Sequence, residues 1–172
     1  MIKNKDVTVS VKYFALASLF WILSVIWLAI IIYLACEVSV DSTARSLQTV
    51  DVLSSVLSIS VPEDIVRKGA HVAEFGVLSF LFYYSLLFTN RISNDYSFKS
   101  TDANLIRSEN EYCIVFTIWL STMVAFVSEY LQLYIEGRSG SVIDVLIDSV
   151  GIFVVLLVIR IAFSVKVMIS NH

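Results

Sequence analysis

Long apolar runs separated by short polar segments dominate this chain of 172 residues. Residues 13–36 carry no charged side chain, and at about 1.5 Å per helical residue they exceed a hydrocarbon core about 30 Å thick. Comparable runs cover about 62–88, 112–135 and 142–163. Because lipid offers no hydrogen-bond partner to an exposed backbone, the pattern predicts an all-α membrane protein with four transmembrane helices.

A fifth segment, at about 42–59, has the pattern of an amphipathic helix. At 100° per residue its leucines and valines gather on one side, and Gln48, Asp51 and several serines gather on the other. Such a helix is typical of the membrane interface, here between the first two spans on the outer side. The sequence leaves two roles open for it, a surface-lying connector and a lid over the polar residues described below.

Composition agrees with a single transmembrane domain over residues 1–172. Apolar residues make up 58% of the chain and charged residues 16%, which is more apolar than soluble domains of this size. The expected surroundings are therefore a lipid bilayer. No basic cluster or ribbon of alternating basic and aromatic residues is present, so nucleic acid is not an expected partner.

The lysines and arginines predict the orientation of the chain. Eight of the twelve lie near the two termini or between the second and third spans, namely Lys3, Lys5, Lys12, Arg91, Lys99, Arg107, Arg160 and Lys166. Because such residues accumulate on the cytoplasmic side, we expect a multi-pass protein with cytoplasmic N- and C-termini. Cys36 and Cys113 then lie at opposite ends of the spans and cannot form a disulfide with each other.

Two polar groups interrupt the apolar runs, and the expected helix directions bring both to the outer end of the bundle. The first group holds Arg67, Lys68, His71 and Glu74, and the second holds Glu129, Gln132, Arg138, Ser139, Asp144 and Asp148. Ionisable residues at membrane depth are costly and usually face a partner, a cavity or a substrate. We therefore expect one shared site. The alternative is that these residues only hold the helices together, at about 1 kcal/mol per contact.

Residue chemistry divides this expected site into two parts. Arg67, Lys68 and Arg138 suit an anionic group, and Ser139 precedes a helix whose free N–H groups favour an anion. Gln132 and Asp144 complete the candidate ligand-binding set. The candidates for acid–base catalysis are His71, Glu74, Glu129 and Asp148.

A divalent cation is a possible cofactor of the same residues. His71 and Glu74 are three positions apart, as in metal-binding helical bundles. One histidine with the carboxylates of Glu74, Glu129, Asp144 and Asp148 is an oxygen-rich set that favours Mg²⁺, Mn²⁺ or Ca²⁺ over Zn²⁺. The sequence does not decide whether a metal is bound or whether the protein is an enzyme.

The spacing of these residues resembles the VanZ-like membrane family over about residues 20–165. The resemblance is carried by Lys68-x-x-His71-x-x-Glu74-Phe75, by Glu129-x-x-Gln132, and by Gly137-Arg138-Ser139-x-Ser141-x-x-Asp144-x-x-x-Asp148-x-x-Gly151. It implies a protein of the bacterial cell membrane, in the envelope of Gram-positive organisms, with a possible contribution to antibiotic resistance against the glycopeptide teicoplanin. Ser128 stands where the family often has a second carboxylate.

Three functions of different classes follow, in this order of preference. The first is an enzyme or binder acting at the outer leaflet on an anionic lipid-linked cell-wall precursor, or on a glycopeptide. The second is a carboxylate-rich metal site in the bundle. The third is a non-catalytic scaffold or small transporter whose polar cluster is structural.

Overall fold

The computed structural model describes residues 11–58, 60–93 and 103–170. These residues form five α-helices: α1 (Val11–Ala35), α2 (Ser39–Leu57), α3 (Glu63–Ser93), α5 (Ala103–Gln132) and α6 (Val142–Ser170). Four of them are long and apolar enough to cross a membrane, over Val11–Ala35, Glu63–Ile92, Ser108–Gln132 and Val142–Val165. The prediction of an all-α protein with four spans is confirmed.

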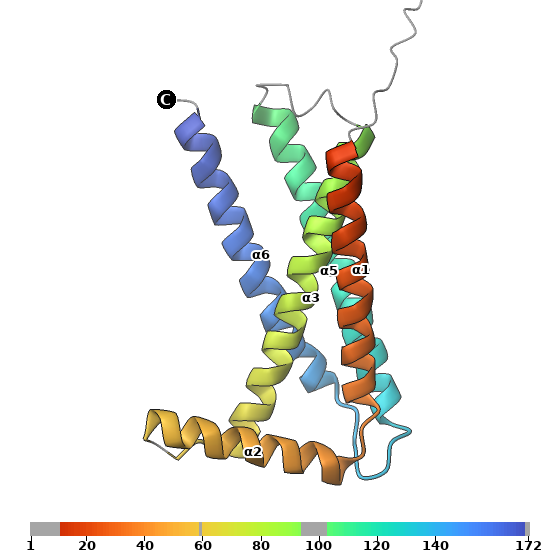
Figure 1. Cartoon of the computed structure of the whole chain (residues 1–172), viewed down its shortest axis with the longest axis vertical. Helices are drawn as coiled ribbons and strands as arrows, with labels where there is room; N and C mark the ends of the chain where they lie inside the picture. Colours follow the sequence, from red (N-terminus) through yellow and green to blue (C-terminus); the bar gives the residue numbers. More distant parts are fainter. Residues whose placement is uncertain (1–10, 59, 94–102, 171–172) are drawn as a thin grey trace, which may run out of the picture.

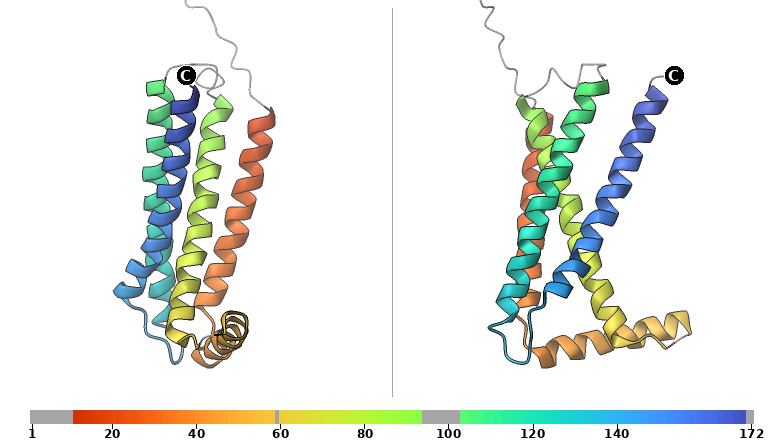
Figure 2. Two further views of the ribbon diagram at one scale, coloured as in Figure 1. Left: turned by 90° about the vertical axis from the view of Figure 1, so that its left-hand side faces the viewer. Right: turned by 180° about the vertical axis from the view of Figure 1, so that it is seen from behind.

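The four spans run lengthwise beside one another, and α2 lies across one end of them (Figure 1). The turn between α5 and α6 is at the same end as α2, whereas the start of α1 and the end of α6 lie at the opposite end. Towards that opposite end, α6 leans away from α3 and α5 (Figure 2). The transverse direction of α2 is compatible with the predicted interfacial helix.

The spans at the end opposite α2 are longer than predicted. The predicted spans ended at about residue 88 and resumed at about residue 112, but α3 continues to Ser93 and α5 already begins at Ala103. The polar residues there pair between helices: Asn90 donates to Glu109 at 3.1 Å, and the Tyr83 hydroxyl donates to Asn110 at 2.5 Å. Because these polar side chains form hydrogen bonds with one another between the two helices, both helices can continue through the polar positions.

Helix α3 is central and packs against each of the other three spans. Phe75, Leu78 and Tyr83 are buried along it, and the hydroxyls of Ser24 and Ser85 lie 3.1 Å apart where α1 crosses α3. Within membranes such crossings depend on close packing and small residues rather than on hydrophobic burial. The chain therefore places α3 where its polar residues can face several neighbours at once.

Two glycines let α3 and α6 approach at backbone distance. A Cβ atom added to Gly151 would lie 2.0 Å from the carbonyl oxygen of Val72, and Gly76 faces Gly151 across the contact. No larger residue fits at position 151 without moving the helices apart. This crossing lies next to His71 on α3 and Asp148 on α6, so it determines how far apart those two side chains are.

A tight turn closes the α2 end between α5 and α6. A Cβ added to Gly140 would lie 2.1 Å from the carbonyl oxygen of Glu129, and Gly137 has a φ of 74°, which favours glycine. A Cβ on Gly137 would also approach Ser39, at the start of α2, to 2.9 Å. The turn thus lies directly against α5 and α2.

Candidate functional site

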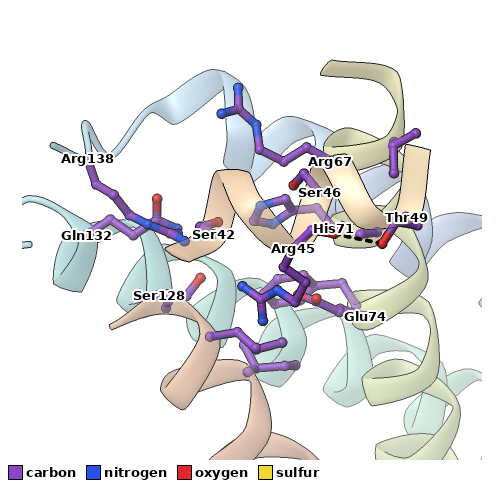
Figure 3. Close-up of a pocket in the computed structure, with 16 residues that line it drawn as sticks. Ser42, Arg45, Ser46, Thr49, Arg67, His71, Glu74, Ser128, Gln132 and Arg138 are labelled. Atoms are coloured by element: carbon purple, nitrogen blue, oxygen red, sulfur yellow. Dashed lines mark hydrogen bonds between the residues drawn. The ribbon is translucent and has the colours of Figure 1, made fainter. Parts of the chain in front are cut away.

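A cavity of about 200 Å³ lies at the α2 end, between α1, α2, α3, α5 and the turn before α6. Its polar lining consists of Ser42, Arg45, Ser46, Thr49, Arg67, His71, Glu74, Ser128, Gln132 and Arg138 (Figure 3). A second cavity of about 130 Å³ shares five of these side chains and adds Lys68, Ser139 and Asp144. Both polar groups singled out in the sequence therefore meet at one end of the bundle.

Helix α2 turns a polar face towards this cavity. Ser42, Arg45, Ser46 and Thr49 follow the spacing that places residues on one side of a helix. Val40 lies on the opposite side and is 76% exposed. The helix thus contributes these four polar side chains to the wall of the cavity.

Arg45 is the main site residue that the sequence analysis missed. The sequence pattern did not indicate it, because the polar side of the helix was assigned from Gln48, Asp51 and the serines. The spacing of Ser42, Arg45, Ser46 and Thr49 was the available signal. This spacing indicates site residues only if that side of α2 faces the bundle, and the tertiary structure determines which side does so.

Three arginines line the cavity, each from a different segment (Figure 3). Arg45 pairs with Glu37, and Arg67 lies 3.2 Å from Asp64. Arg138 has no carboxylate partner within the part of the chain that the structure describes. Burial, and then the positive charges of Arg45 and Arg67, lower the pKa of Arg138. An anion bound here would relieve the repulsion among these three cations.

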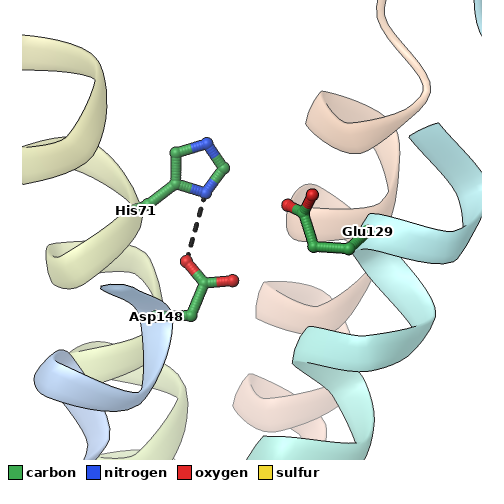
Figure 4. A group of neighbouring side chains, drawn as sticks. All are labelled: His71, Glu129 and Asp148. Atoms are coloured by element: carbon green, nitrogen blue, oxygen red, sulfur yellow. Dashed lines mark ion pairs between the residues drawn. The ribbon is translucent and has the colours of Figure 1, made fainter. Parts of the chain in front are cut away.

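Three ionisable side chains, from three helices, converge in a compact group (Figure 4). Nδ1 of His71 lies 3.3 Å from Oδ1 of Asp148. One donor atom each from His71, Asp148 and Glu129 all lie within 4.8 Å of one another. The Asp148 side chain is fully buried, and apart from the contact with His71 neither of its oxygens has a hydrogen-bond partner among the described residues.

Glu129 is held in place by two hydrogen bonds. Its Oε1 accepts a hydrogen bond from Nε2 of Gln132 at 2.9 Å, and its Oε2 accepts one from the backbone N–H of Ser141 at 3.0 Å. The hydroxyl of Ser141 in turn accepts from the N–H of Ile143 at 3.1 Å, as a capping residue does at the start of α6. The carboxylate on α5 is therefore fixed relative to the first turn of α6.

Glu74 and Asp144 lie outside this compact group of three. Glu74 lines the larger cavity, and its backbone carbonyl accepts a hydrogen bond from Nε1 of Trp27 at 2.9 Å. Asp144 lines the smaller cavity. Of the five carboxylate and imidazole groups expected to share one site, the structure brings His71, Glu129 and Asp148 closest together.

These features define a four-span helical membrane protein with a polar pocket at one end, covered by an amphipathic helix. A sequence model of the VanZ/LLP1 family matches residues 20–163, which is most of the chain. The chain belongs to the VanZ/LLP1 family. No curated protein and no solved structure matches it.

Proposed function

We propose that this protein binds the anionic head group of a lipid-linked envelope component at the outer leaflet and supports acid–base chemistry on it. The observation that carries the proposal is the convergence of Arg45, Arg67 and Arg138 on one cavity with His71 and Glu74 in its wall. Phosphate is the anion that this arrangement favours, because it offers more oxygens than a carboxylate to three guanidinium groups, each of which can bind two of them.

The position of the cavity supports a lipid rather than a soluble ligand. It lies at the end of the spans, beside the transverse helix α2, where the head groups of a surrounding bilayer would be. Val52 and Val56 are exposed apolar residues on the same side of α2 as Arg45 and Thr49 but outside the cavity, and they give α2 a surface suited to lipid. A lipid with a phosphate head group would place its charge at the arginines and keep its chain in the membrane.

The His71–Asp148 pair supports the acid–base part of the proposal. A carboxylate beside one ring nitrogen of a histidine fixes which nitrogen carries the proton and orients the ring. The other ring nitrogen then exchanges protons with a group bound in the cavity. Glu74 lines the same cavity and is the second candidate for proton transfer.

The proposed biological setting is the envelope of a Gram-positive bacterium, with both termini in the cytoplasm and the cavity on the outer face. The distribution of lysine and arginine supports this orientation. A cell-wall precursor carried on a lipid phosphate is the ligand class we favour. A contribution to teicoplanin resistance would then follow from binding or changing that precursor, or from binding the glycopeptide itself.

The proposal is tested by measuring lipid binding to the purified protein in detergent by native mass spectrometry. Polyprenyl phosphate should bind, and the polyprenol of the same chain length should bind at least about tenfold more weakly, since hydrogen bonds to charged groups contribute about 1.5–3 kcal/mol. Arg138→Gln should remove most of this preference for phosphate.

Arg160→Gln is the matched control, because Arg160 lies on α6 and pairs with Glu111 at 2.8 Å, away from the cavity. It should keep the wild-type preference. Equal binding of the phosphate and the alcohol by the wild-type protein would overturn the proposal. An equal loss of preference in Arg160→Gln would also do so, because it would show that only general surface charge is measured.

A further inference from the structure

We propose that His71, Glu129 and Asp148 bind a divalent cation beside the larger cavity. With the ion bound, His71 would serve as a ligand, and proton transfer in that cavity would fall to Glu74. This inference deepens the proposed function, and the role of the ion in binding a phosphate group rests on that function. The coordination of the ion does not depend on the identity of the lipid, because the three side chains that would bind the ion already converge from α3, α5 and α6.

The environment of Asp148 is the first argument. Its side chain is fully buried, and apart from His71 no group in the described residues donates to its oxygens. A buried carboxylate without hydrogen bonds is costly unless an opposite charge compensates it. His71 supplies at most one positive charge, whereas Glu129 adds a second carboxylate to the same group. A divalent cation would compensate both.

The spacing of the donor atoms is the second argument. All three lie within 4.8 Å of one another, and metal–ligand bonds of about 2.0–2.6 Å from a central ion span such separations. Three protein ligands leave coordination positions open. Those positions would hold water or the oxygens of a bound phosphate, as in metal sites that act on phosphate groups.

The hydrogen bonds of Glu129 are the third argument. Metal-binding carboxylates are commonly held by further hydrogen bonds, which fix their direction. Here Gln132 and the Ser141 N–H each occupy one oxygen of Glu129, at 2.9 Å and 3.0 Å. Each oxygen keeps a second lone pair that can bind the ion. The carboxylate is thus positioned before any ion arrives.

One imidazole and two carboxylates form a set of mostly hard donors, which favours Mn²⁺ or Mg²⁺. His71 lines the same cavity as Arg45, Arg67 and Arg138, so the ion would lie at the wall of the cavity that these cations line. A ligand that binds both the ion and the arginines would need several oxygens that carry high negative charge. The substrate class is therefore a phosphate ester or diphosphate, in preference to a carboxylate.

The test is a titration of the purified, chelator-treated full-length protein in detergent with Mn²⁺ alone, followed by electron paramagnetic resonance. The wild-type protein should bind Mn²⁺ at a single site. Asp148→Asn and His71→Gln should each weaken binding at least about tenfold, as loss of a ligand or its support commonly does. Asp51→Asn is the control with the same change of charge, and it should retain binding within about threefold of wild type, because Asp51 is exposed on α2 and lines neither cavity.

Two ligand variants are used so that the test remains valid if one of them fails to fold. His71→Gln changes a half-buried residue, whereas Asp148→Asn changes a fully buried one. Absence of Mn²⁺ binding by the wild-type protein, or equal binding by all three variants, would overturn the inference. The binding of polyprenyl phosphate is then measured with chelator present. Lipid binding without any metal binding would refute the cation site alone, and metal binding without phosphate preference would refute the proposed function alone.

Discussion

Nδ1 of His71 on α3 lies 3.3 Å from Oδ1 of Asp148 on α6, at the depth where Gly76 and Gly151 bring these helices into backbone contact. The ion pair and the glycine contact are neighbours along both helices. A change that separates the backbones at Gly151 would therefore also separate the two side chains. The geometry of the candidate site depends on this crossing.

Gly151→Ala should destabilise the protein. The added Cβ would meet the Val72 carbonyl oxygen at 2.0 Å, so the helices must move apart, and overpacking of this kind typically costs about 1–3 kcal/mol. Thermal unfolding in detergent measures the effect. Gly69→Ala is the matched control, because a Cβ there has no neighbour within 4 Å and alanine favours the helix by up to about 1 kcal/mol. Equal stability of the two variants would contradict the role of the crossing.

Glu129→Gln and Glu74→Gln should leave membrane insertion and thermal stability near wild type. In Glu129→Gln the amide oxygen can still accept the hydrogen bond from the Ser141 N–H, which now measures 3.0 Å, and Gln132 can turn its own amide oxygen towards the new NH2 group. Both variants should nevertheless abolish the envelope phenotype, such as altered glycopeptide susceptibility in cells, because an amide neither transfers the proton nor carries the charge of the carboxylate.

The two readouts separate a functional role of these carboxylates from a structural one. A retained phenotype in both variants, at normal expression, would remove the acid–base hypothesis and favour a scaffold. Lost expression in both would show that the carboxylates hold the helices together.

Arg138→Lys should fall between the wild-type protein and Arg138→Gln in its preference for polyprenyl phosphate over polyprenol. Lysine keeps the charge but lacks the planar group that donates two parallel hydrogen bonds to phosphate oxygens. Native mass spectrometry provides the comparison. A lysine variant equal to wild type would show that charge alone attracts the head group.

The orientation is tested by thiol labelling of whole cells, in a protein whose Cys36 and Cys113 are replaced by serine. A cysteine at Ser139, in the turn at the α2 end, should react with an impermeant reagent. A cysteine at Ser97, in the segment between the second and third spans and outside the described residues, should not react. The reverse pattern would place the cavity on the cytoplasmic side.

The number of spans and the meeting of the two polar groups were predictable from sequence, because apolar run length and residue spacing along a helix depend on local chemistry alone. Other features depend on which helix faces share a contact. Arg45 joins the site only because α2 turns that side towards the bundle. Likewise, Glu109 and Asn110 lie within α5 and form hydrogen bonds with residues of α3, and no local pattern reveals those partners.

Protection of a cysteine within the cavity tests most directly whether the polar pocket beneath α2 is a binding site for an anionic lipid. Ser46 lines the cavity, and Val56, 74% exposed on the same helix, does not. In protein without other cysteines, polyprenyl phosphate should slow thiol labelling of Ser46→Cys and leave Val56→Cys unchanged, and polyprenol should slow neither. Labelling of Ser46→Cys at one rate with and without the phosphate lipid would contradict the proposed site.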